Sequence, residues 1–391
     1  MRFPEFEEEW NIKTLGSLSK GIGDGIHATP IYDDNGSYYF INGNNLSERG
    51  INISEATKRV SKEEAYKNNA AILNDRTILL SINGTIGNVA LYNNEPIMLG
   101  KSACFINVSP HINKHYVYHY LQTNKCQTYF KSELTGTTIK NLSLQSVRNA
   151  KIALPSIYEQ NRIAKLLDVI DERIATQSKL IEKLESLIKG IMVELQKQGV
   201  NKGTWKKVFL SDVLTERKER NTNLFQVFSV SVSQGVVNQV DYLGRSFAAK
   251  DTSKYNVVHY GDLVYTKSPT GSFPYGIVKQ SLSLENVAVS PLYGVYKPQS
   301  LAVGAYLHEY FMSEINTHNY LHPLIQKGAK NTINITNQRF LENCVLLPTN
   351  INELLLISKM LRSLNDKFKY QQDTLQKYQK QKKYLLRQMF I

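Results

Sequence analysis

Cysteine is rare in this chain: Cys104, Cys126 and Cys344 are its only three, and they lie far apart in a sequence of 391 residues. An odd and unclustered set excludes a disulfide framework and indicates a reducing compartment. The chain has no run of about 18 apolar residues, so we expect no membrane span. Its first residues, MRFPEFEEEW, are acidic and lack an apolar core, so we expect no signal peptide and a cytoplasmic protein.

The motifs of common nucleotide-dependent enzymes are also absent. The sequence contains no P-loop and no Asn/Asp-Pro-Pro-aromatic methyltransferase motif. Gly21-Ile-Gly23-Asp-Gly25 lacks a preceding strand and the third spaced glycine of a dinucleotide site, so we expect a simple loop there. Asp212 with Glu216-Arg-Lys218 is the nearest match to a nuclease pattern, but it is too compressed, and we expect a solvated charged face. We therefore expect no catalytic residues.

Three histidines, His111, His115 and His119, recur every four residues, a spacing that could present nitrogens to Zn²⁺ on one helix. No glutamate accompanies them as in H-E-x-x-H, no cysteine is close, and Pro110 suggests that the helix begins only there. We expect histidines on the surface or packed between domains, and no metal site.

Basic residues outnumber acidic ones. The chain has 47 Lys and Arg against 34 Asp and Glu, a net charge of +13. Residues 349–391 contribute +6 of this, from 9 basic and 3 acidic residues. A basic chain favours a polyanionic partner. Residues 1–155 are nearly neutral, with 16 basic and 14 acidic residues, so the charge is supporting evidence only.

Two segments of the sequence are similar: IALPSIYEQNRIAKLLDVIDERI around residue 154 and VLLPTNINELLLISKMLRSLNDKF around residue 347. With one extra residue after the second Pro, the helices align at an offset of 194, which matches Ile163 with Ile357. Because the period is about half of the chain, the repeat predicts two similar halves. Each half has a globular body and a helix: residues 1–155 with 156–200, and residues 201–348 with 349–391.

Both helices carry an apolar seam with heptad spacing, which predicts an antiparallel coiled coil about 60 Å long. A glutamine interrupts each seam near its midpoint, at the matching positions Gln177 and Gln371. Either the two glutamines meet and fix the register, or each points to the rim and has no role. The predicted seam consists of Ile163, Leu167, Ile170, Ile174, Gln177, Ile181, Leu184, Ile357, Leu361, Leu364, Phe368, Gln371, Leu375 and Tyr378.

The two bodies share a frame but not their other residues. Trp10 and Trp205 each precede a leucine by five residues, and short strand-like runs follow. Each body then has a Ser and a Gly turn, Ser81–Thr85 and Ser268–Ser272, at an offset of 187. A predicted helix and a glycine loop complete each body, so we expect two α+β bodies with divergent surfaces.

This pattern resembles the specificity (S) subunit of type I restriction-modification systems, over the whole chain. The resemblance is carried by the repeated Leu-Pro…Glu…Ile-Ala/Ser-Lys helix openings, the Trp-x4-Leu openings and the turn Gly84–Gly87. The second turn reads Gly271-Ser-Phe-Pro274, so any role of Gly87 does not transfer. The resemblance implies an α+β fold with two α/β target recognition domains, separated by two long antiparallel coiled-coil helices in a pseudo-twofold internal repeat.

The resemblance also implies a function in restriction, DNA methylation and phage defence in a bacterium or archaeon. The chain would be a non-catalytic DNA-binding subunit, with each domain reading half of a bipartite double-stranded site and the helices acting as a ruler. Its implied partners are two modification (M) subunits, which carry S-adenosylmethionine and methylate adenine, and restriction (R) subunits, which use ATP and Mg. The chain itself would bind no cofactor.

Residues that could contact DNA are those whose side chains read base edges or bind phosphate, placed in small-residue loops between strands. We expect them to cluster on one concave side of each domain. The candidates are Asn83, Thr85, Lys101, Thr137, Thr138 and Lys140 in the first domain, and Arg245, Lys250, Lys254, Lys267, Ser268, Thr270, Lys327, Lys330 and Asn331 in the second.

Two other classes of function are kept as alternatives. A self-contained DNA-modifying or DNA-cleaving enzyme would need several hundred more residues carrying the missing motifs. A structural coiled-coil protein would bind only other proteins, and its complexes would show no preference for any split DNA site.

Overall fold

The computed structural model describes residues 2–390 except 48–49, 69, 137–139 and 328–332. It divides into two compact units: unit 1 comprises Met1–Leu180 and Gln372–Ile391, and unit 2 comprises Ile181–Gln371. Two helices, α5 (Ile157–Asn201) and α11 (Ile351–Met389), contribute one half to each unit. None of the helices in the described ranges is long and apolar enough to cross a membrane.

Unit 1 begins with a mixed body. Its helices are α1 (Lys62–Asn68), α2 (Lys114–Leu121), α3 (Asn124–Ser132) and α4 (Leu144–Asn149). Its strands are β1 (Asn11–Thr14), β2 (Ser19–Asp24), β3 (Tyr38–Ile41), β4 (Leu46–Ser47), β5 (Gly50–Ile51), β6 (Arg59–Val60), β7 (Thr77–Ser81), β8 (Val89–Leu91), β9 (Ile97–Leu99), β10 (Ala103–Val108), β11 (Leu134–Thr135), β12 (Asn141–Leu142) and β13 (Lys151–Leu154).

Unit 2 has a body of the same kind. Its short helices are α6 (Leu210–Val213), α7 (Gln239–Leu243), α8 (Leu301–Tyr310), α9 (Glu314–Leu321) and α10 (Asn337–Phe340). Its strands are β14 (Trp205–Phe209), β15 (Leu214–Glu216), β16 (Phe228–Ser231), β17 (Gly235–Asn238), β18 (Asn256–Val258), β19 (Leu263–Tyr265), β20 (Val278–Gln280), β21 (Val287–Val289), β22 (Gly294–Pro298), β23 (Gln326–Lys327), β24 (Ile333–Asn334) and β25 (Cys344–Pro348).

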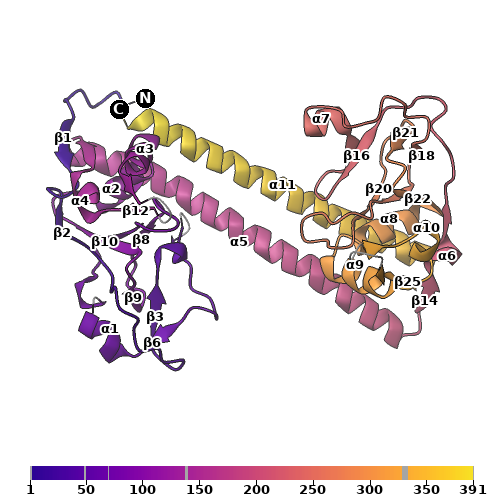
Figure 1. The fold of residues 1–391 in the computed structure, drawn as a ribbon, viewed down its shortest axis with the longest axis horizontal. Helices are drawn as coiled ribbons and strands as arrows, with labels where there is room; N and C mark the ends of the chain where they lie inside the picture. The colour runs from indigo at the N-terminus through magenta and orange to yellow at the C-terminus, as the bar shows by residue number, and fades with distance from the viewer. Residues whose placement is uncertain (1, 48–49, 69, 137–139, 328–332, 391) are drawn as a thin grey trace. The chain divides into compact units, whose positions relative to one another are not determined.

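The two bodies share a four-stranded sheet and two strand pairs, but their remaining sheets differ: β6-β3-β9 and β4-β5 in unit 1, and β16-β17 and β18-β21 in unit 2. Each contains a four-stranded antiparallel sheet, in the order β2-β10-β7-β8 in unit 1 and β15-β22-β19-β20 in unit 2. The first strand of each body pairs with the last, β1 with β13 and β14 with β25, and a short antiparallel pair precedes the last strand in each, β11-β12 and β23-β24. In unit 1, α2, α3 and α4 lie on the side of the sheet that faces the start of α5 (Figure 1). The predicted α+β fold class is confirmed.

The long helices begin directly after the final strand of each body. Pro155 disfavours strand continuation, and the Ser156 hydroxyl accepts a hydrogen bond from the Glu159 amide, as a helix N-cap does. At the start of α11, the Asn350 side chain accepts from the amides of Asn352 and Glu353. Both predicted helix starts therefore lie close to the observed ones.

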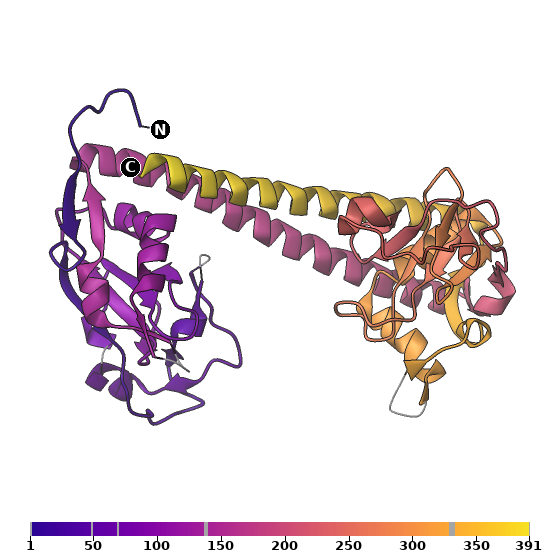
Figure 2. The ribbon, with the colours of Figure 1, turned by 45° about the horizontal axis from the view of Figure 1, so that its top comes forward.

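Within each unit the two half-helices share one core with the body. In unit 1, Ile163 and Leu167 of α5 belong to the same buried cluster as Met389 and Phe390 at the chain's end, so the end of α11 lies beside the start of α5 (Figure 2). In unit 2, Leu354 of α11 and Met192 of α5 belong to one cluster. Apolar burial of this kind contributes about 25 cal/mol per Å².

Each of the predicted seam residues is buried or half-buried. Gln177 is 9% exposed, so its side chain does not point into solvent. Gln177 belongs to unit 1 and Gln371 to unit 2, and their predicted meeting stays a prediction.

A partly buried tryptophan–glutamate hydrogen bond connects each body to its helix. Trp10 Nε1 donates to Glu159 Oε2 at 3.2 Å, and Trp205 Nε1 donates to Glu353 Oε1 at 2.9 Å. The partners are matching positions of the repeat, 10 with 205 and 159 with 353. The Trp that opens each half therefore anchors its first strand to the first turn of the long helix.

The glycine-rich segment Gly21–Gly25, which we expected to be a loop, is mostly strand β2. Gly23 faces the ring of Phe105 on β10, and a Cβ at Gly23 would come within 2.8 Å of that ring. Gly23 is needed for the close approach of this aromatic ring, and the expectation of a loop was wrong.

In unit 1 a partly buried polar cluster connects the body to both long helices. His119 on α2 is fully buried, and its Nε2 lies 2.9 Å from Asp168 Oδ1 on α5. His115 Nδ1 lies 3.0 Å from the same oxygen, and Lys382 of α11 pairs with Asp171 at 2.8 Å. Burial lowers the pKa of His119, while its hydrogen bond to Asp168 opposes that shift. The described residues contain no group of three or more metal-ligating side chains that could hold an ion.

Unit 2 uses different chemistry at the same helix positions. The repeat matches Asp168 with Arg362 and Asp171 with Asn365. In unit 2, Arg362 donates to Gln280 Oε1 at 3.2 Å, and Asn365 Nδ2 donates to the buried Glu309 carboxylate on α8. The long helices are repeated, but the helix side chains that contact each body differ between the two units.

Glu309 predicts a pH-dependent stability for unit 2. Burial raises its pKa from 4.5 to about 7, against the opposing hydrogen bond from Asn365. Because the folded state holds this proton more tightly than the unfolded chain does, the stability that Glu309 contributes is complete below pH 4.5 and is lost as the pH rises through about 7. We expect Glu309→Gln, which cannot ionise, to be about 3 kcal/mol more stable than the unchanged protein at pH 8.5 and equally stable near pH 4.

The measurement is denaturant unfolding of the two proteins across that pH range. Glu285→Gln, at an exposed carboxylate of the same unit, is the matched control and should show no pH-dependent difference. A Glu309→Gln advantage that does not grow between pH 4 and 8.5 would contradict the assignment.

Candidate nucleic-acid interface

The turn after the central strand of unit 1 is held by its own polar groups. Gly84 and Gly87 have positive φ angles of 74° and 93°, the backbone region that favours glycine. Thr85 Oγ1 donates to the Gly43 carbonyl at 2.7 Å and lies 3.1 Å from Ser81 Oγ. The Thr85 hydroxyl therefore shapes the turn, although the residue is exposed.

Beside this turn lies a polar hollow of about 240 Å³ in unit 1. Its lining brings together two of the predicted DNA-contacting residues, Asn83 and Lys101, from different loops. Asp24, His27 and Asn141 line it as well, and His27 Nε2 lies 2.8 Å from Asp24 Oδ2. The hollow thus offers both hydrogen-bond donors and acceptors, which are the groups that read base edges.

Sequence reasoning missed Asp24, His27 and Asn141. Asp24 ends β2 and Asn141 begins β12, and the pairing of Asn83 with Asn141 is what brings the hairpin to the turn. These contacts are non-local, and no spacing in the sequence signals them. Lys140, exposed, precedes Asn141, whereas Thr137 and Thr138 lie outside the described residues.

The corresponding turn of unit 2 corrects the sequence alignment. The Ser81 amide donates to the Asn88 carbonyl, and the Thr266 amide donates to the Ile277 carbonyl, in the same position of the sheet. Ser81 therefore matches Thr266, at an offset of 185 rather than 187. The alignment of Ser81 with Ser268 was wrong because the second turn is longer than the first. It matched two serines that do not occupy equivalent positions in the two sheets.

The new register also restores the missing glycine. Gly87 lies two residues before β8, and Gly276 lies two residues before β20. Their φ angles are 93° and 96°. The conformational role of Gly87 does transfer, to Gly276 rather than to Pro274.

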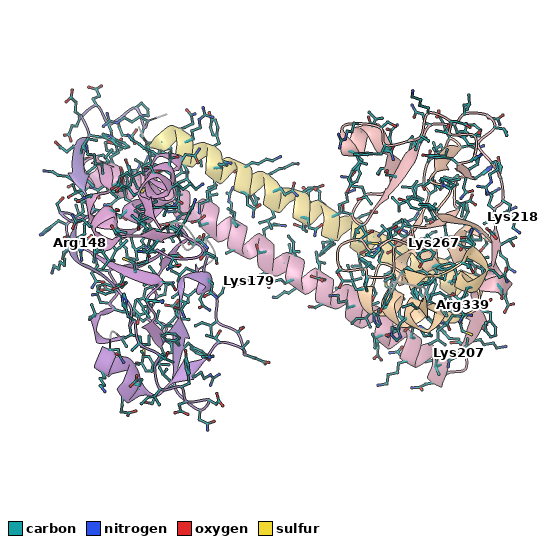
Figure 3. All side chains as sticks on the ribbon, viewed as in Figure 1. Arg148, Lys179, Lys207, Lys218, Lys267 and Arg339 are labelled. Atoms are coloured by element: carbon teal, nitrogen blue, oxygen red, sulfur yellow. The ribbon has the colours of Figure 1, made fainter. Side chains whose placement is uncertain are left out.

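Lys267, Ser268 and Thr270 all lie in this second turn. Lys267 is half-buried, and burial lowers the pKa of its ammonium group while the Glu216 carboxylate opposes that shift. Ser268 is exposed, and Thr270 makes a bridge to Phe273. Figure 3 marks Lys267 in unit 2 together with Lys218 and Arg339.

The other unit 2 candidates lie elsewhere in the chain. Arg245, Lys250 and Lys254 are exposed in the segment between α7 and β18, and the Arg245 guanidinium lies 4.5 Å from the ring centre of Phe247. Lys327 belongs to β23, and Lys330 and Asn331 lie outside the described residues. The predicted concave clusters stay a prediction.

Comparison with known proteins gives a consistent result. Residues 7–186 match the model of the type I restriction modification DNA specificity domain. The chain is 28% identical over 200 residues to the type I restriction enzyme MjaVIII specificity subunit of Methanocaldococcus jannaschii, covering 49% of this chain and 43% of that protein. It is 26% identical over 180 residues to the EcoR124I/EcoR124II specificity subunit of Escherichia coli, covering 44% of this chain and 43% of that protein.

These alignments cover less than half the length of each curated relative. A solved structure covers more: the type I restriction-modification S subunit from M. genitalium superposes with a TM-score of 0.65, over 100% of this chain and 99% of that one. At 14% identity this similarity establishes the fold alone.

Proposed function

We propose that this chain is a type I restriction-modification specificity subunit and that it recognises a bipartite DNA site without catalysing any reaction itself. The observation that carries the proposal is the contrast between the units. The four-stranded sheets of the two units have the same strand order, but matching positions beside the central turn carry different side chains, as Ile82 and Lys267 do. Two domains that recognise different half-site sequences require such a difference.

In this proposal, residues 1–155 and 201–348 are the target recognition domains and residues 156–200 and 349–391 are the spacer helices. In the first domain, Asn83 and Lys101 would contact DNA from the polar hollow, with Lys140 beside it. The second domain would use the turn that contains Lys267, and its exposed lysines would bind phosphates. Phosphate contacts position a protein on the duplex, and base contacts give it specificity.

The spacer would set the distance between the half-sites. A helix of 45 residues, the length of α5, extends for about 68 Å at 1.5 Å per residue. One turn of DNA rises about 34 Å, so a helix of that length can separate two readers by more than one turn.

The partners in this proposal carry the chemistry. Two modification subunits would bind S-adenosylmethionine and methylate adenine, and restriction subunits would use ATP and Mg to cleave DNA. The absence of P-loop and methyltransferase motifs from the sequence supports this division of labour.

The decisive experiment is sequencing of methylated adenines in the host genome, with and without this gene. We expect one split motif to lose methylation in the deletion strain and to regain it on complementation. The purified chain alone should neither cut DNA nor transfer methyl groups. Stoichiometric activity of the chain alone would favour the self-contained enzyme, and a complex without any preference in a randomised DNA pool would favour a structural coiled-coil protein.

A further inference from the structure

Lys267 has a backbone conformation that lysine rarely adopts. Its φ angle is +61°, in the left-handed region where a side chain is strained. Two hydrogen bonds fix the backbone beside it: the Thr266 amide donates to the Ile277 carbonyl, and the Ile277 amide donates to Thr266 Oγ1 at 3.1 Å. A Cβ at Gly276 would come within 2.8 Å of the Lys267 nitrogen, so the turn also excludes larger residues there. Strain that is held in this way is typical of functional positions.

The residue at the matching position of unit 1 shows that the fold does not need a lysine. Ile82 is 3% exposed, and its amide and carbonyl bond to Ser102 and Leu142. An apolar side chain therefore satisfies this position in one copy of the frame. At the matching position of unit 2, a charged lysine side chain stands in place of this buried isoleucine side chain.

The Lys267 ammonium makes no hydrogen bond or ion pair with the described residues, although the residue is half-buried. A desolvated cation without a partner is unfavourable unless a ligand supplies acceptors. The carboxylate that acts on it electrostatically is Glu216, at the end of β15.

Glu216 is itself held in place. Asn337 Nδ2 donates to Glu216 Oε1 at 2.6 Å, and the Tyr296 hydroxyl donates to the Asn337 carbonyl at 3.2 Å. Tyr296 is fully buried in the core of unit 2. This chain of bonds holds the Glu216 carboxylate in place, and that carboxylate acts electrostatically on the Lys267 ammonium without an ion pair between them.

We propose that Lys267 reads a guanine in the half-site of unit 2, and that Glu216 and Asn337 are its positioning residues. The inference rests on the proposed function. Lysine offers three donors and no acceptor, and guanine is the base that presents two acceptors, O6 and N7, in the major groove. A half-buried lysine on a fixed backbone suits a base edge, whereas the exposed Lys250 and Lys254 suit the phosphate backbone.

The test uses the complete complex with its modification subunits and a DNA pool randomised over both half-sites. For Lys267→Met we expect about a tenfold loss of preference for guanine at one position of one half-site, with the other half-site unchanged. Lys254→Met is the matched control and should weaken binding to all sequences equally. A uniform loss for Lys267→Met would make it a phosphate contact and overturn the proposal, as would an unchanged preference.

A second measurement does not depend on the variant folding. Replacing each guanine of the recognised site with 7-deazaguanine removes the N7 acceptor while the protein stays unchanged. We expect one such replacement to weaken binding of the unchanged complex and to have no further effect on the Lys267→Met complex. No effect at any guanine, or a half-site without a G·C pair, would overturn the inference. If the unchanged complex shows no sequence preference at all, the proposed function itself has failed.

Discussion

Replacing Phe340 with alanine is expected to lower the free energy of unfolding of unit 2 by about 3–5 kcal/mol. The Phe340 ring is fully buried and stacks between Tyr265 and Tyr296, with centroids 4.7 Å away on each side. Phe311 and Tyr320 also contact it, with centroids at 6.2 Å and 5.7 Å. Alanine leaves a cavity that these rigid rings cannot close, so the transfer and cavity costs add. Denaturant unfolding of the full chain measures the loss.

The location of the damage can be tested by hydrogen exchange. Amides of β19 and β22 should exchange faster in Phe340→Ala, while those of β7 and β10, in the matching sheet of unit 1, should keep their protection. Phe247→Ala is the matched control, because that ring is 58% exposed and its loss should change stability by less than about 0.5 kcal/mol. A loss below about 1 kcal/mol for Phe340→Ala would show that the aromatic stack does not hold unit 2 together.

The long helices could be predicted closely from the sequence because their signals are local. The heptad spacing, the Leu-Pro before each helix and the polar cap all lie within a few residues of the structure that they determine. The predicted range 156–200 compares with the observed Ile157–Asn201, and the range 349–391 compares with Ile351–Met389.

The register of the bodies could not be predicted in this way. Matching Ser81 with Ser268 followed residue identity, whereas the structure aligns Ser81 with Thr266 through strand hydrogen bonds. The length of a turn can differ between the two repeated bodies, because the sheet fixes only the two strand ends that the turn connects. The Ile82–Lys267 contrast, which carries the inference about guanine, was therefore invisible in the sequence alignment.

The polar attachments between bodies and helices were also missed. Asp168 and Asp171 are heptad positions outside the seam, where charges normally face water. In the structure both are only partly exposed, because fully buried His119 meets Asp168 and Lys382 pairs with Asp171. Whether a charge on a long helix is solvated depends on what packs over it, and helix periodicity alone does not contain that information.

Inserting one heptad into both long helices is expected to abolish binding to the original split site and to favour a longer gap between the half-sites. The insertions belong after Leu180 and after Gln371, at the boundary of the two units, where they leave the body attachments intact. Seven residues add about 10 Å to each helix, which is at most about three base pairs of DNA. A whole heptad keeps the apolar seams in phase, so folding should be preserved.

The readout is the preferred gap in a DNA pool that carries both half-sites at every spacing. The matched control is the same insertion in α5 alone, which shifts one seam against the other and should lower stability rather than change the gap. Because the recognition bodies are untouched, the bases preferred within each half-site should not change. A double insertion that folds but keeps the original gap would refute the ruler. The spacing would then have to come from the bodies or from the partner subunits, and the constancy of the two helical seams would need another cause.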